Sequence, residues 1–200
     1  MKELGLSCRV RVKKYQSYRG ETGKIAPNLL QREFHGEKPN QKWVTDVTEF
    51  HLFGKKLYLS SILDLHGSYL ISYTLADTPA LSLVTTMLEK AFREIPEGTG
   101  LILHSDQGWQ YQHKQYQRML KEKGIRQSMS RKGNCLDNAV IENFFGILKS
   151  ELLYLQKFES MEEFRKELIT YLEYYNRNRI KIKLKGLPPA KYRQQALSGI

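Results

Sequence analysis

Three acidic residues occupy positions where a carboxylate calls for an explanation. Asp46 lies within WVTDVTEFHLF, whose alternation and Val, Thr and Phe content predict a β-strand, and strands disfavour an unpaired carboxylate. Asp106 ends LILHSD, a short apolar run typical of a strand covered on both faces, just before a glycine-containing turn. Glu142 lies on a helical stretch, and thirty-five residues separate it from Asp106. Taken singly, Asp46 could simply point outward beside its two threonine neighbours.

The helical stretch that carries Glu142 has two different faces. Apolar residues follow one face at helical spacing: Leu136, Val140, Phe144, Ile147, Leu148 and Leu152. The other face carries Asn138, Glu142, Gly146 and Lys149. We therefore expect the apolar face to pack on a flat surface, with Glu142 and Lys149 two turns apart on an exposed line, either as a solvated ion pair or as part of a site.

Together, the three acids predict a site for hard divalent cations. Mg²⁺ needs oxygen ligands, and the two cysteines, Cys8 and Cys135, have no cysteine or histidine partner at zinc-site spacing. Clustered carboxylates repel one another when no cation is present, so a purely structural trio is disfavoured. Two ions about 4 Å apart can activate an attacking oxygen and stabilise the leaving oxygen in a phosphodiester displacement.

The elements expected to position these acids are mostly strands before residue 80 and alternate with helices after it. The sequence predicts a three-strand meander, a helix over residues 81 to 95, the strand that ends at Asp106, a helix that stops at Gly124, and a fifth short strand, IRQSMS. The order β-β-β-α-β-α-β thus precedes the helix of Glu142.

Charge and length restrict the class of protein. The chain has 200 residues, 40% of them hydrophobic, which is enough for one core. Its net charge of +11 divides into +6 for residues 1–42, −4 for 43–106 and +9 for 107–200, which predicts a cation site between surfaces that bind polyanions. We expect nucleic acid as the partner and no membrane, because the sequence has no basic amphipathic helix with a wide apolar face and no run of eighteen apolar residues. A polar, basic N-terminus argues against a secretory signal, so we expect a cytoplasmic protein.

The two basic ends give weaker signals. The first 42 residues mix Arg and Lys with tyrosines but lack apolar periodicity, which indicates an extended arm that either follows a phosphate backbone or remains a solvated tail. Near the other end, Ser160 and Glu163 have capping-box spacing before an amphipathic helix that we expect to complete the core. The segment RNRIKIKLKGLPPAKYR then carries seven Lys or Arg and no acid. Its alternation favours an edge strand with a cationic face, and Pro188 and Pro189 are expected to prevent regular structure.

Aromatic side chains and a histidine flank Asp106. Trp109 and Tyr111 either stack on an unpaired base or close the turn. His104 lies two residues before Asp106 and could order water beside the acids, but a strand histidine is more often a packing residue.

Five sequence blocks resemble the DDE transposases and retroviral-type integrases, specifically the second-frame transposase of insertion sequences whose two reading frames are joined by frameshifting. The blocks are KKYQSYRGETGKIAPNLL, KWVTDVTEF, HSDQGWQY, MSRKGNCLDNAVIENFFGILKSE and YYNRNRIKIKLKGLPPAKYR, which cover nearly the whole chain. Chains of this family usually carry a helix-turn-helix upstream, and Met1 begins inside the region that would follow it. We therefore expect specific recognition of the element's ends to need more than this polypeptide.

The resemblance implies an α/β fold, with a ribonuclease H-like mixed five-stranded sheet flanked by helices. It implies a basic N-terminal arm over residues 1–42, an integrase catalytic core over 43–156, and a C-terminal helix with a basic tail over 157–200 that completes the core.

The resemblance also implies a set of site residues. Asp46, Asp106 and Glu142 would be catalytic and would hold Mg²⁺ or Mn²⁺, with two ions expected. Lys149 matches the family's basic residue that contacts the DNA end. Further DNA contacts are expected at Arg131, Lys132, Asn138, Arg177, Arg179, Lys181, Lys183 and Lys185.

We therefore predict a DNA transposase catalytic subunit, a divalent-metal-dependent polynucleotidyl transferase that cleaves and joins DNA strands as a homo-oligomer on DNA. The resemblance implies that joining can first link the two ends of one element into a circle. Two alternatives stay open at this point. One is a nuclease that carries the same acids and only hydrolyses, and the other is an inactive DNA-binding remnant.

Overall fold

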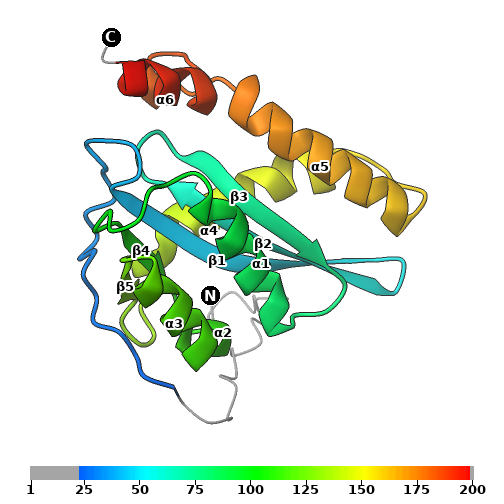
Figure 1. Cartoon of the computed structure of the whole chain (residues 1–200). Coiled ribbons are helices and arrows are strands. Elements are labelled where there is room, and N and C mark those ends of the chain that lie inside the picture. The colour runs from blue at the N-terminus through cyan, green and yellow to red at the C-terminus, as the bar shows by residue number, and fades with distance from the viewer. Residues whose placement is uncertain (1–22, 199–200) are drawn as a thin grey trace, which may run out of the picture.

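The structure, a computed structural model, describes residues 23 to 198, and the part of the predicted basic arm before residue 23 lies outside them. A mixed sheet of five strands forms its centre, in the order β3-β2-β1-β4-β5 (Figure 1). Its strands are β1 (Lys42–Leu52), β2 (Lys55–Asp64), β3 (Tyr69–Ala76), β4 (Ile102–Ser105) and β5 (Arg126–Met129). The first three pair antiparallel, and β4 and β5 continue the sheet in parallel with β1. The predicted five-stranded mixed sheet is confirmed.

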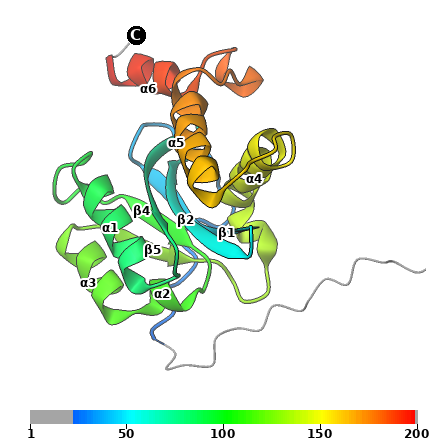
Figure 2. The same ribbon diagram turned by 90° about the vertical axis from the view of Figure 1, so that its right-hand side faces the viewer.

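Helices cover both faces of the sheet, as Figure 2 shows edge-on. On one face lie α1 (Leu81–Phe92), α2 (Trp109–Gln112) and α3 (Lys114–Glu122). On the other lie α4 (Ala139–Leu148), which continues into a π-helical turn (Lys149–Leu153), and α5 (Met161–Arg177). Each layer of helices buries its own apolar cluster against the strands, so the sheet separates two cores. Within the described residues, no helix is long and apolar enough to cross a membrane.

The helix face predicted for α4 is partly wrong. A short 3₁₀ turn (Cys135–Asn138) precedes α4, and Leu136 in it is 58% exposed. The buried residues of the helix and its extension are Ile141, Phe144, Phe145, Leu148 and Leu152. Because the regular helix begins only at Ala139, the apolar stripe is centred about one residue away from the predicted one, and Asn138 is buried.

The C-terminal part also differs from its prediction. Ser160 caps α5 as expected, since its hydroxyl accepts a hydrogen bond from the N–H of Glu163 at 3.1 Å. The predicted edge strand in RIKIKLK is wrong: Ile182–Leu184 forms a 3₁₀ turn with one isolated bridge beside it. Pro188 and Pro189 do not prevent regular structure, because Pro189 begins α6 (Pro189–Ser198), and proline is tolerated in the first turn of a helix.

The segment from Gly23 to Gln41 runs beside β4 and β5 without forming a helix or strand (Figure 1). Leu30 from this segment is buried in the core on the α4 and α5 side. The N–H groups of Leu29 and Leu30 donate to the hydroxyl of Ser128 on β5, at 2.9 and 3.3 Å. We call residues 24 to 35 the strap. The strap thus packs as part of the same fold as the sheet.

Candidate active site

Two of the predicted acids come from neighbouring parallel strands. The register pairs Trp43 with Leu103 and Val44 with His104. Asp46 lies two residues after Val44 on β1, and Asp106 lies two residues after His104, at the end of β4. Side chains alternate along a strand, so Asp46 shares the sheet face of Val44, whose side chain belongs to the core under α4 and α5. Adjacent strands lie about 4.8 Å apart, so the register brings these two acids together at the sheet surface.

The third acid comes from the helix that packs on this same face. Glu142 lies in the first turn of α4 with its side chain exposed, while Ile141 next to it is fully buried against the sheet. Burial and the charge of Asp106 raise the pKa of Glu142 above its ordinary value. The helix therefore brings Glu142 within electrostatic reach of Asp106.

The electrostatics of the site are those of an uncompensated acidic cluster. Burial, followed by the charges of Asp106 and Glu142, raises the pKa of Asp46 to about 8, although the N–H of Val47 and the charge of Lys149 act in the opposite direction. Burial likewise raises the pKa of Asp106, whose Oδ1 accepts a hydrogen bond from the N–H of Gly108 at 2.8 Å. Such groups are stabilised when a cation arrives, so the donor set fits a hard divalent ion.

The three carboxylates have not closed around a common point. Among residues 23 to 198, no three acidic, histidine or cysteine side chains are arranged to hold a metal ion as they stand. Mutual repulsion between the carboxylates opposes closer approach when no cation is present.

Lys149 provides the nearby positive charge. It opens the π-helical turn after α4, and its ammonium nitrogen lies 5.6 Å from the centroid of the Phe50 ring. Burial lowers its pKa, whereas the charges of Glu49 and Asp46 raise it. The contact with the ring of Phe50 on β1 thus holds Lys149 beside the acids.

The turn after Asp106 shows what its aromatic residues do. Tyr111 is buried, its ring packs at 69° against that of Tyr116, and the centroids are 5.3 Å apart, so Tyr111 closes the turn and does not offer its ring to a base. Trp109 is 37% exposed. A Cβ at Gly108 would lie 2.9 Å from Oδ1 of Asp106, so a side chain there would crowd the acid.

The residues expected to contact DNA fall into two groups. Arg131 and Arg179 are engaged within the protein, by ion pairs to Asp137 and Glu151 respectively, and Lys181 donates to the hydroxyl of Tyr175 at 2.6 Å. Asn138 is buried, contrary to its predicted exposed position. The exposed group consists of Lys132, Arg177, Lys183 and Lys185.

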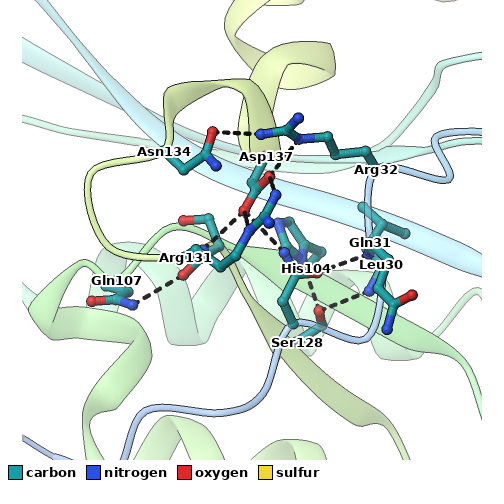
Figure 3. A network of polar contacts seen from close by, with 11 residues as sticks. Leu30, Gln31, Arg32, His104, Gln107, Ser128, Arg131, Asn134 and Asp137 are labelled. Carbon is teal, nitrogen blue, oxygen red and sulfur yellow. Dashed lines mark hydrogen bonds and ion pairs between the residues drawn. The ribbon is translucent and has the colours of Figure 1, made fainter.

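Sequence reasoning missed Asp137, which lies between the turn at Gly133 and the start of α4. Its carboxylate is 1% exposed and accepts hydrogen bonds from Asn28, Arg32 and Arg131 (Figure 3). An acid within the basic stretch SRKGNCLDN is a signal that could have identified it.

Comparison with known proteins agrees with this geometry. Residues 36–135 match the family described as integrase core domain, and residues 142–197 match a second family of that description. The chain is 54% identical over 195 residues to the putative transposase InsK for insertion sequence element IS150 of Escherichia coli K12, covering 98% of this chain and 69% of that protein. It is 52% identical over 198 residues to an uncharacterized transposase-like protein of Haemophilus influenzae, covering 99% and 91% respectively.

Solved structures share the fold at low sequence identity. The catalytic core domain of HTLV-2 integrase, in a trimeric form with magnesium, superposes with a TM-score of 0.60 at 16% identity, over 80% of this chain and 99% of that one. A chain of the simian T-cell lymphotropic virus intasome gives a TM-score of 0.67 at 18% identity, over 86% of this chain and 60% of that one. The ribonuclease H-like fold expected from the sequence is thereby confirmed, and the chain belongs to the family of insertion-sequence transposases that carry an integrase core domain.

Proposed function

We propose that this chain is the catalytic subunit of a DDE-type DNA transposase, a polynucleotidyl transferase that cleaves and joins DNA strands. The observation that carries the proposal is that Asp46, Asp106 and Glu142 lie close enough for their charges to act on one another, since the charges of Asp106 and Glu142 raise the pKa of Asp46 and the charge of Asp106 raises that of Glu142. The transposase relatives support joining over hydrolysis alone. The presence of all three acids speaks against an inactive remnant.

We propose Mg²⁺ or Mn²⁺, with two ions, as the cofactor of this site. One structural neighbour was solved with magnesium. When bound, such ions activate the attacking oxygen and stabilise the leaving oxygen of an in-line displacement. The three carboxylates would hold the ions, and Gly108 would keep Asp106 oriented through its N–H. Lys149, held over Phe50 beside Asp46, would contact the phosphate and fix its position.

Two displacements at phosphorus complete the proposed reaction. In the first, a water oxygen forms a bond to phosphorus at the element's end, the P–O3′ bond breaks, and the released strand keeps a 3′-OH. In the second, that 3′-OH attacks a target phosphodiester, so one P–O bond forms as another breaks and no external energy source is consumed. We propose that the protein performs these steps as a homo-oligomer on DNA, in the cytoplasm. Support comes from a viral intasome and from trimeric and dimeric integrase cores among the structural neighbours.

A strand-joining assay tests the proposal. The substrate is a labelled duplex that carries the ends of the element encoding this chain, with a supercoiled plasmid as target and Mg²⁺ present. The wild-type protein is expected to give joined product, Asp106→Asn none, and Asp77→Asn, at an exposed carboxylate after β3, the wild-type yield. Cleavage without joining would identify a nuclease, and joining by Asp106→Asn would remove the acids from the mechanism.

Lys149→Ala separates positioning from affinity in the same assay. The variant is expected to lower the joining yield about tenfold, because small displacements of the reacting phosphate cost rate, while affinity for random duplex changes little. The matched control is Lys183→Ala, at an exposed lysine, which should weaken binding without a separate loss of joining. A proportional loss of affinity and joining in both variants would make Lys149 an ordinary backbone contact.

A further inference from the structure

Asp137 is the centre of a polar network that connects three separate segments. Its carboxylate accepts five hydrogen bonds, from the side chain of Asn28, from Nε of Arg32, and from the N–H, Nε and Nη2 of Arg131, at 2.8 to 3.0 Å. Arg32 also donates to the side chain of Asn134 at 2.9 Å. Figure 3 shows the two guanidinium groups reaching this carboxylate from different sides. Asn28, Arg32 and Asp137 all lie outside the two matched stretches, 36–135 and 142–197.

His104 connects the same network to β4. The Ser128 hydroxyl oxygen accepts two N–H groups from the strap and lies 2.8 Å from Nδ1 of His104. With both lone pairs of that oxygen occupied, the serine proton is donated to Nδ1.

Two members of the network are close in sequence to proposed metal ligands. His104 is two residues before Asp106, and Asp137 is five residues before Glu142, in the 3₁₀ turn that leads directly into α4. No side-chain hydrogen bond caps the start of α4 at Asn138. Asp137 therefore adds polar anchorage directly before a first helical turn that is otherwise held by the packing of Ile141.

We propose that Asp137 is a positioning residue that, held by Arg32, Arg131 and Asn28, fixes the start of α4 so that Glu142 faces Asp106. Glu142 and Asp106 carry like charges when both are ionised, so they repel each other. An unanchored first turn would relieve this repulsion by moving Glu142 away from β4. Five hydrogen bonds to a carboxylate that is 1% exposed oppose that movement. The strap, which supplies Asn28 and Arg32, then helps to position a metal ligand of the proposed site.

The inference rests on the proposed metal site, and its test is calorimetric titration of the whole chain with Mn²⁺, combined with thermal melting in EDTA. Asp137→Asn is expected to weaken Mn²⁺ binding about tenfold, as the loss of a residue that orients a metal ligand does. Arg32→Ala removes one of the two guanidinium groups that bind Asp137, and the Arg32 side chain is 41% exposed. This variant should weaken Mn²⁺ binding severalfold with little change in melting temperature. The matched control is Arg118→Ala, from the exposed pair with Glu122, which should bind as the wild type does.

A double variant shows whether Asp137 acts through Glu142. If it does, Asp137→Asn combined with Glu142→Gln binds Mn²⁺ as weakly as Glu142→Gln alone, since the ligand that Asp137 positions is already removed. A full additional tenfold loss in the double variant would overturn the inference. So would wild-type Mn²⁺ affinity in Arg32→Ala and in a folded Asp137→Asn. A wild-type protein that binds no Mn²⁺ would instead overturn the proposed function.

Discussion

Asp137 lies in the 3₁₀ turn before α4 and Asp46 lies on β1, and the surrounding protein affects the two carboxylates in opposite ways. Asp137 accepts five hydrogen bonds, and those from Arg131, with Arg32 adding to them, hold its pKa well below its usual range. Asp46 accepts a hydrogen bond from the N–H of Val47 at 2.7 Å, and burial together with two other carboxylates raises its pKa to about 8.

The difference supports the proposal that Asp137 is a structural acid, whereas Asp46 and its neighbouring acids bind an external cation. The Asp137 network neutralises its charge inside the protein, so that carboxylate stabilises the fold without any ligand. Burial, joined by neighbouring carboxylates at Asp46 and Glu142, raises the pKa values of Asp46, Asp106 and Glu142, so ionising them costs free energy that Lys149 offsets only in part. Such a cost is expected at a site whose preferred state contains bound cations.

The largest effect is expected from Asp46→Asn. The variant should lose cleavage and joining by at least about 10³-fold, because metal-assisted stabilisation of the transition state is worth several kcal/mol. In EDTA it should nevertheless melt about 3 °C higher than the wild type at pH 8. An acid whose folded pKa is raised destabilises the fold increasingly as the pH rises from its ordinary pKa towards the folded value near 8, and asparagine removes that effect.

Scanning calorimetry across pH 5 to 8 checks this stability change. Glu97→Gln, at an exposed carboxylate, serves as the control for removing one negative charge. A lower melting temperature for Asp46→Asn throughout this range would show that Asp46 supports the fold as Asp137 does, and the contrast between the two aspartates would disappear.

The next largest effect concerns His104, at the junction of the network with β4. Its pKa is lowered from 6.5 to about 4 by burial, so between these values the unfolded chain takes up a proton that the folded protein does not. The free energy of unfolding should therefore fall as the pH decreases, with His104 contributing about 2 kcal/mol of loss between pH 7 and pH 5.

His104→Asn keeps an acceptor near Nδ1 but cannot ionise, so its stability should fall less over the same range. Urea unfolding at both pH values measures the difference, with His51→Asn, at an exposed position on β1, as the control. Equal losses in the wild type and in His104→Asn would mean that the folded protein accommodates a protonated ring.

Local alternation and periodicity correctly predicted the strands and the helix that carry the acids, and the family resemblance implied their assembly into a mixed five-stranded sheet. The Asp137 network could not be predicted in this way. Its partner Arg32 is 105 residues away, and no local pattern indicates that pairing. The wrong edge strand in RIKIKLK has a similar cause: Leu184 is buried and Lys181 is bound to Tyr175, so tertiary contacts override the alternation.

The smallest effects should divide the basic tail into structural and DNA-binding cations. Arg179, paired with Glu151, is expected to support the fold, so Arg179→Ala should lower the free energy of unfolding by about 1 to 3 kcal/mol. Lys183→Ala, at an exposed lysine, should leave stability unchanged and reduce the slope of log affinity against log salt for random duplex by about 0.9. Chemical unfolding and a salt series of binding measurements check both, and the opposite assignment of effects would contradict the division.

The most direct test of the acidic site is the number of Mn²⁺ ions bound per chain in the presence of an element-end duplex. The wild-type protein is expected to bind two, as the proposed displacement requires. The triple variant Asp46→Asn, Asp106→Asn, Glu142→Gln should bind none at the same concentration, while the Asp137 network keeps it folded. Two ions bound by the triple variant would place the metal elsewhere and contradict the assignment of these three carboxylates.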